Sequence, residues 1–107
     1  MNQKAAIVTG GSRGIGRSIA LMLARAGWKI AITYRSDAEA AREAADEIND
    51  SGSQAYLINL DISNLEQVNL LVDSVMERFG TINLLVNNAG IAPRIRADML
   101  HVDETSF

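Results

Sequence analysis

Four short apolar segments alternate with three segments of helical periodicity, and this alternation is what most constrains the fold. The apolar segments, which we interpret as strands, span residues 4–9, 28–34, 54–60 and 82–87. Strands that are joined through a helix must run parallel, and such crossovers are right-handed in nearly all proteins. The order β-α-β-α-β-α-β therefore predicts a parallel sheet with helices on both faces, which is an α/β fold.

The expected helices have recognisable starts and stops. Ser36 precedes Glu39 by three residues, and Ser63 precedes Glu66 in the same way. In such a capping box the hydroxyl accepts from a backbone N–H at the start of the helix, so we expect both serines to be N-caps. The glycines expected to end the three helices are Gly27, Gly52 and Gly80.

Composition argues against several classes of partner. The formal net charge is −3, the sequence pI is about 5.0 and no basic tract is present. We therefore expect neither nucleic acid nor an anionic membrane surface as a partner. The chain has no cysteine, which suits a cytoplasmic protein. Its first ten residues match neither a signal peptide nor a membrane span.

The stretch "TGGSRGIGRS", residues 9–18, connects the first expected strand to the first expected helix. Its glycines Gly10, Gly14 and Gly16 allow the backbone to approach a ligand closely. Unpaired N–H groups and the positive end of the helix dipole favour an anion there. The spacing is G-x-x-x-G-x-G, not the G-x-G-x-x-G dinucleotide fingerprint. A tight turn that binds nothing is the alternative.

The same stretch also differs by one residue from a P-loop. Residues 11–18 match G-x-x-x-x-G-R-S, with Arg17 where a P-loop has lysine. A planar guanidinium is not equivalent to the compact lysine charge that a P-loop places on the phosphates. Asp61, which follows a strand, is a weak candidate for the magnesium ligand. We therefore rank a nucleoside triphosphatase far behind a dinucleotide-binding protein.

A second motif, "LLVNNAG", spans residues 84–90. It places two asparagines at the carboxyl end of the fourth expected strand, where open α/β sheets bind ligands. On its own, this motif could simply form a turn, because asparagine and glycine are common turn residues. Together with the glycine turn, it resembles the short-chain dehydrogenase/reductase family, in its 3-oxoacyl-carrier-protein reductase and glucose dehydrogenase-like branches. The resemblance covers essentially the whole chain and implies a Rossmann-type doubly wound sheet, of which this chain is the N-terminal half with strand order 3-2-1-4.

The resemblance implies cofactor-binding roles for residues from both motifs and from the third strand's end. Those near the pyrophosphate and adenosine are Gly10, Ser12, Arg13, Gly14, Ile15 and Gly16. Those around the adenine are Asp61 and Ile62, and those along the ribose and nicotinamide are Asn88, Ala89 and Gly90. The alternative for Asp61 is charge compensation at the start of the next helix. Asn87 is expected to join strands instead of touching the cofactor.

The end of the second strand bears on the choice between NAD and NADP. An acid there would accept from the ribose hydroxyls of NAD, but the sequence reads Tyr34-Arg35-Ser36 and the first acid, Asp37, comes later. Arg35 and Arg13 could instead flank a 2′-phosphate, with Ser36 adding a hydroxyl. We predict NADP as the cofactor, with NAD possible. The alternative is that the arginines are only solvated surface groups.

The resemblance also implies catalytic groups that this sequence does not contain. The family's reaction needs a tyrosine with a lysine four residues later, a serine and usually an asparagine. Tyr34 and Tyr56 are the only tyrosines, and Ala38 and Leu60 stand four positions after them. We therefore expect residues 1–107 to be the cofactor-binding part of one domain, without catalytic residues or turnover of its own. The single histidine, His101, has no metal-ligand partners, so no metal site is expected.

Two functions stay open. The first is part of an NADP-dependent oxidoreductase that acts on a carbonyl or secondary alcohol, with a 3-oxoacyl thioester among the candidate substrates. The second is a non-catalytic dinucleotide-binding or interaction module. Finding Tyr-x-x-x-Lys in the gene beyond Phe107 would favour the first. Family members usually form dimers or tetramers, so we expect a homo-oligomer of the longer protein. The isolated chain should associate through the apolar edge of residues 82–87.

Overall fold

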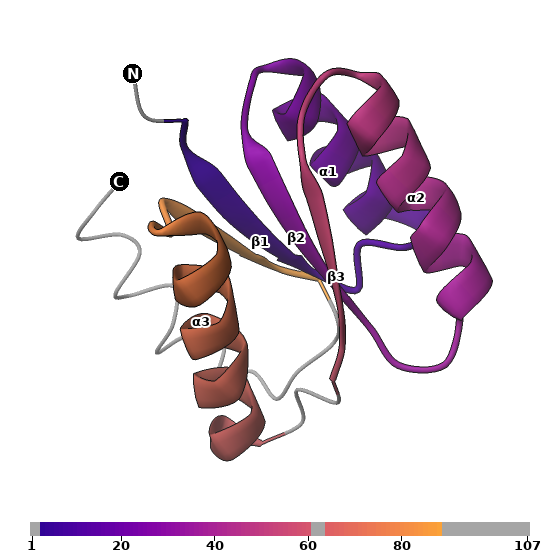
Figure 1. Ribbon diagram of the computed structural model, residues 1–107. Coiled ribbons are helices and arrows are strands. Elements are labelled where there is room, and N and C mark those ends of the chain that lie inside the picture. Colours follow the sequence, from indigo (N-terminus) through magenta and orange to yellow (C-terminus); the bar gives the residue numbers. More distant parts are fainter. Residues whose placement is uncertain (1–2, 61–63, 89–107) are drawn as a thin grey trace.

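The computed structural model describes residues 3–60 and 64–88. Strands and helices alternate along the chain as β1 (Ala5–Thr9), α1 (Gly14–Arg25), β2 (Lys29–Tyr34), α2 (Ala38–Asp50), β3 (Ala55–Asn59), α3 (Leu65–Phe79) and β4 (Leu84–Asn87). The four strands form one sheet in the order β3-β2-β1-β4, and all neighbours pair in parallel (Figure 1). The predicted α/β class, Rossmann-type topology and strand order are confirmed.

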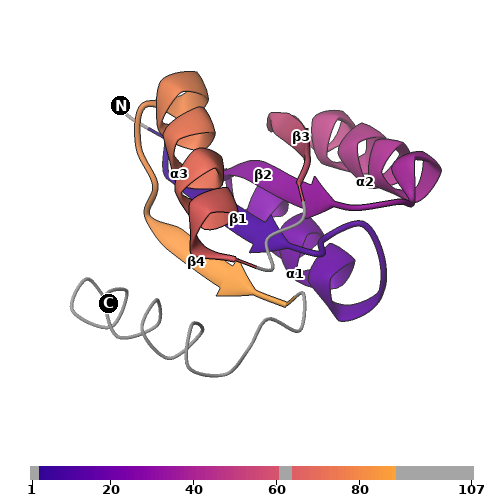
Figure 2. The same cartoon turned by 90° about the horizontal axis from the view of Figure 1, so that it is seen from below.

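The helices lie on both faces of the sheet, which separates the core into two halves. Helices α1 and α2 cover one face and α3 covers the other (Figures 1 and 2). Side chains of β1 alternate between them: Ala6 and Val8 pack toward α1 and α2, whereas Ala5 and Ile7 pack toward α3. A strand that is apolar on both faces is what a sheet covered by two helical layers requires.

Strand β1 lies in the interior of the sheet and carries the glycine turn at its carboxyl end. All five of its residues are buried. Val8 is paired with Ile32 of β2 and with Val86 of β4, so the carboxyl ends of the three strands lie side by side. This register brings the glycine turn, the end of β2 and the two asparagines together.

The fully buried residues of helix α1 are all small. Its buried residues are Gly16, Ala20 and Ala24, which are four apart and form one stripe along the helix. The Arg17 guanidinium pairs with carboxylates of α2, at 3.8 Å from Glu43 and in a closer contact with Glu47. The stripe packs α1 against the sheet, and the ion pairs join it to α2 on the same face.

The N-cap of α2 differs from the sequence prediction. Asp37 is the cap: its Oδ1 accepts from the backbone N–H of Ala40 at 3.1 Å. Asp and Ser are about equally good N-caps, and the aspartate stands one residue nearer to the first turn. The prediction that Ser36 caps this helix is therefore wrong, and Ser36 faces a groove described below.

The prediction for α3 is wrong in the same way. Asn64 is its N-cap, with Oδ1 accepting from the backbone N–H of Gln67 at 2.9 Å. An asparagine at this position competes with Ser63 on equal terms. The predicted helix ends are confirmed. Gly27 and Gly52 directly follow the C-caps of α1 and α2, Gly80 is the C-cap of α3, and all three glycines have positive φ. In the part of the chain that the structure describes, no helix has the length and apolar character to cross a bilayer.

Candidate functional site

The glycine turn changes the direction of the chain between β1 and α1. Gly10 and Gly14 have φ values of 66° and 60°, a left-handed conformation that glycine adopts without steric cost. The Gly10 N–H donates to Thr33 Oγ1 at 3.1 Å, which ties the turn to the end of β2. This hydrogen bond fixes the start of the turn against β2.

Gly16 lets the first turn of α1 lie directly against the glycine turn. A Cβ added at Gly16 would be 2.5 Å from Asn88 Nδ2 and 2.6 Å from the Gly10 carbonyl oxygen. Gly11, which sequence reasoning did not single out, is packed against β1, since its Cβ would be 3.1 Å from Val8 Cγ1. Close packing, and not only ligand approach, therefore accounts for the glycine content of this stretch.

The start of α1 differs from the starts of α2 and α3. Its N-cap, Arg13, makes no side-chain cap hydrogen bond, and the first turn contains no acid. In contrast, α2 and α3 have the caps described above and carry Glu39 and Glu66 in their first turns. The positive end of the α1 dipole is therefore not compensated by its own first turn. An uncapped helix start after a glycine turn is suited to bind an anion.

Thr9 joins the glycine turn to the asparagine motif. Its Oγ1 accepts from the backbone N–H of Asn88 at 2.8 Å and lies 3.2 Å from Asn87 Oδ1, to which it donates. The Asn88 Nδ2 group donates to the Gly10 carbonyl at 3.3 Å. The expected strand-joining role of Asn87 is confirmed. Sequence reasoning missed Thr9, although a threonine at the end of an otherwise apolar strand was a usable signal.

A groove of about 400 Å³ lies at the carboxyl ends of β1 and β2. Five predicted cofactor residues line it: Gly10, Ser12, Arg13, Arg35 and Ser36. The other lining residues, which are not among the predicted cofactor residues, are Thr33, Tyr34, Asp37 and Leu60. The structure therefore brings together the two arginines and two serines that were predicted from separate segments.

The remaining predicted residues lie elsewhere. Gly14 and Ile15 line a separate shallow hollow on α1, and the Ile15 residue is 73% exposed. Gly16 and Asn88 contact the glycine turn from the side of α1 and β4. The predictions for Asp61, Ile62, Ala89 and Gly90 lie outside the described residues.

The groove carries two positive charges and one negative charge among its described residues. Arg13 Nη1 lies 3.4 Å from Asp37 Oδ2, and these side chains are 75% and 37% exposed. Arg35 also lines this groove, at the start of the β2–α2 connection. With the open start of α1 nearby, this end of the sheet is suited to hold a phosphorylated ligand.

The arrangement argues against a P-loop. Arg17, which occupies the position of the P-loop lysine, turns to Glu43 and Glu47 on α2 and not to the glycine turn. Its guanidinium is engaged there, so it does not serve as a phosphate-binding cation in this structure. Within the described ranges, no group of three acidic or histidine side chains is placed to hold a metal ion.

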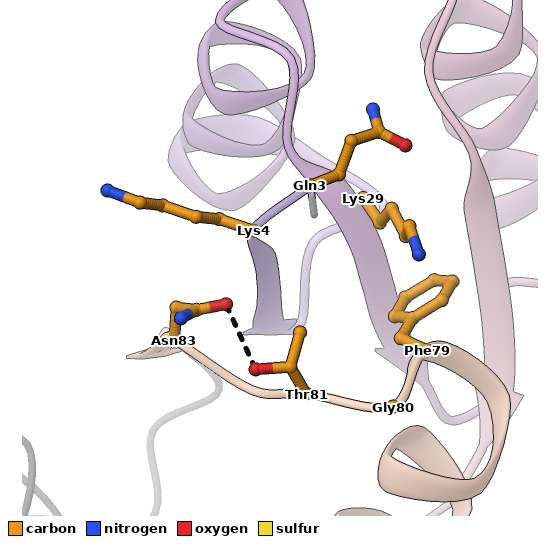
Figure 3. A pocket seen from close by; sticks show the side chains of 7 residues that line it. All are labelled: Gln3, Lys4, Lys29, Phe79, Gly80, Thr81 and Asn83. Carbon is orange, nitrogen blue, oxygen red and sulfur yellow. Dashed lines mark hydrogen bonds between the residues drawn. The ribbon is translucent and has the colours of Figure 1, made fainter. Parts of the chain in front are cut away.

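A second hollow, of about 600 Å³, lies at the other end of the strands, where β1, β2 and β4 begin (Figure 3). Lys29 Nζ is 5.6 Å from the centre of the Phe79 ring, and Lys4 Nζ is 5.5 Å from that of Trp28. Asn83 Oδ1 accepts from the backbone N–H of β1 at 2.9 Å, so it has a structural role. Because open α/β sheets bind ligands at the carboxyl ends of their strands, we assign the site to the smaller groove.

Comparison with known proteins agrees with this geometry. Residues 4–107 match the sequence family described as short chain dehydrogenase. The 3-oxoacyl-[acyl-carrier-protein] reductase FabG of Staphylococcus aureus is 42% identical over 88 residues, which cover 82% of this chain and 36% of that protein. The chain thus spans about a third of the length of the curated relatives it matches.

Solved structures give the same result. A short chain dehydrogenase from Burkholderia cenocepacia, crystallised in complex with NADP, is 47% identical, with a TM-score of 0.79 over 84% of this chain and 37% of that one. Acetoin dehydrogenase YohF from Salmonella typhimurium is 32% identical, with a TM-score of 0.77 over 97% of this chain and 50% of that one. On sequence and fold alike, this chain belongs to the short-chain dehydrogenase family.

Proposed function

We propose that this chain supplies the adenosine- and pyrophosphate-binding part of an NADP(H)-dependent oxidoreductase. The reaction is hydride transfer between the nicotinamide and a carbonyl or secondary alcohol. Relatives of this chain are named as reductases and dehydrogenases, and one neighbour was crystallised with NADP. The longer protein is expected to be a cytoplasmic homo-oligomer.

The observation that carries the proposal is the shared groove of Arg13, Arg35 and Ser36 beside the open start of α1. Arginines bind phosphate oxygens through paired N–H groups, and a serine hydroxyl can add one more donor. A 2′-phosphate would therefore be held by side chains, while the pyrophosphate would be held by backbone N–H groups. Asp37 is not placed as a free ribose acceptor, because it caps α2 and pairs with Arg13.

The residues of this chain would bind and orient the cofactor without donating a proton to the substrate. When bound, NADP(H) supplies or accepts the hydride. The sequence holds no Tyr-x-x-x-Lys, so we assign proton donation to a part of the protein outside these 107 residues. Thr9 and Asn88 contribute by keeping the glycine turn fixed against the end of β4.

For the substrate we propose a 3-oxoacyl thioester, because a relative with that named activity is 42% identical to this chain. A small hydroxyketone is the second candidate, which rests on the neighbour named acetoin dehydrogenase. A non-catalytic binding module is the alternative. It would bind NADPH, but the full-length protein would reduce neither class of carbonyl.

Titration of the protein with NADPH and NADH tests the cofactor assignment. Arg35→Ala should weaken NADPH binding by about 1.5–3 kcal/mol, the range for a hydrogen bond to a charged group, and leave NADH almost unchanged. Arg25→Ala is the matched control, because Arg25 is an exposed arginine at the far end of α1. Equal losses for the two cofactors would show that Arg35 does not read the 2′-phosphate. Failure to bind either cofactor would refute the proposed function.

A further inference from the structure

We propose that Asp37 sets the preference between 2′-phosphorylated and unphosphorylated adenosine ligands by acting as a counter-charge to Arg13. The inference rests on the proposed function, since it concerns the same groove. Among the described residues that line this groove, Asp37 is the only acid. It therefore subtracts from the positive charge that two arginines would otherwise present.

Both oxygens of the Asp37 carboxylate have partners. Oδ1 accepts from the Ala40 N–H at 3.1 Å, and Oδ2 lies 3.4 Å from Arg13 Nη1. The first contact holds the carboxylate at the start of α2 in the groove wall. The second means that any phosphate bound by Arg13 must share this guanidinium with a carboxylate.

The effect of this carboxylate depends on the ligand. A 2′-phosphate carries up to two negative charges, so it is repelled by Asp37 and also finds the α2 dipole already neutralised. A ribose 2′-hydroxyl is uncharged and meets neither penalty. Asp37 should therefore lower affinity for the phosphorylated ligand and leave the other nearly unaffected. A protein with both arginines and Asp37 would accept both cofactors instead of excluding one.

The charge of Asp37 can be separated from its capping role. Asparagine and serine are N-caps about as good as aspartate, so Asp37→Asn and Asp37→Ser keep a cap at the start of α2 while removing the charge. Glu39→Gln is the matched control. It removes the same charge from the first turn of the same helix, but Glu39 is exposed and does not line the groove.

The probes are adenosine 2′,5′-bisphosphate and adenosine 5′-monophosphate, which differ only by the 2′-phosphate. Isothermal titration of the protein should show Asp37→Asn binding the bisphosphate about three- to tenfold more tightly than the unsubstituted protein does. Binding of the monophosphate should stay within about twofold. The gain should shrink in 0.5 M salt, because the groups are partly exposed and a charge effect is screened there.

Several results would overturn the inference. These are weaker bisphosphate binding by both neutral variants, an equal change for the two probes, or the same gain in Glu39→Gln. Weaker binding would mean that Asp37 orients Arg13 for the phosphate instead of competing for it. If the unsubstituted protein binds neither probe, the proposed function fails and the inference fails with it. If it binds both and the neutral variants change nothing, only the inference fails.

Discussion

Replacing Gly16 by alanine tests whether close packing of α1 on the glycine turn is essential. In an ordinary helix interior this change stabilises by about 1 kcal/mol, because alanine is the better helix former. Here the new Cβ would lie 2.6 Å from the Gly10 carbonyl oxygen and 3.1 Å from the Gly11 Cα. These are backbone atoms, so relief requires the turn to open, and we take about 3 kcal/mol for the overpacking. The expected net loss is about 2 kcal/mol.

Thermal unfolding followed by circular dichroism measures this loss. For a domain of this size, about 2 kcal/mol corresponds to a fall in Tm of about 8–16 °C. Gly14→Ala is the informative comparison. Its φ is 60°, but no atom lies within 4 Å of the added Cβ, so it isolates backbone strain, roughly 1–2 kcal/mol, from steric overlap. An unchanged or higher Tm for Gly16→Ala would refute the packing argument.

Two further pairs of substitutions, each a test variant with its control, examine the strand junction and the core. Thr9→Val keeps the side-chain shape but removes the hydroxyl that serves Asn87 and Asn88, so chemical unfolding should show a loss of about 1–3 kcal/mol. Thr81→Val, whose hydroxyl makes only a 3.4 Å contact to an exposed asparagine, should change stability by less than about 0.5 kcal/mol. Leu71→Ala, at a position 1% exposed, should cost about 2–5 kcal/mol in the same assay. The adjacent Leu70 is 50% exposed, and a similar cost for Leu70→Ala would contradict the assigned orientation of α3.

The sheet could be predicted from sequence because several local signals agree. Apolar runs, glycine stops and helical periodicity each indicate the same element order, and parallel strands follow from the connections. The strand order came from the resemblance to a family, since hydrophobic patterns carry no information on which strands become neighbours. The start of each helix was predicted less well. Asp37 and Asn64 were overlooked because a capping box is a conspicuous pattern, whereas a single good cap residue is not.

Many residues of the site could be predicted from the sequence, but the contacts between them could not. The arginines and serines of the groove were named from two separate segments, and the register of β1 and β2 brings them together. Thr33 was missed, because its role is to accept from the N–H of Gly10, 23 residues earlier in the sequence. The Arg13–Asp37 pair was missed for the same reason. Contacts of this kind depend on backbone geometry that a residue pattern does not specify.

The small buried residues of α1 also determine how precisely the start of that helix is positioned. Gly16, Ala20 and Ala24 keep the helix axis close to the sheet along its whole length. A bulkier side chain in place of Ala24 would push the C-terminal end of α1 away from the sheet and so tilt the helix. Its first N–H groups would then be aimed away from a bound phosphate, although no atom of the groove had been altered. Under the proposed function, affinity for the cofactor would therefore depend on Ala24, which lies more than two helical turns from the start of α1.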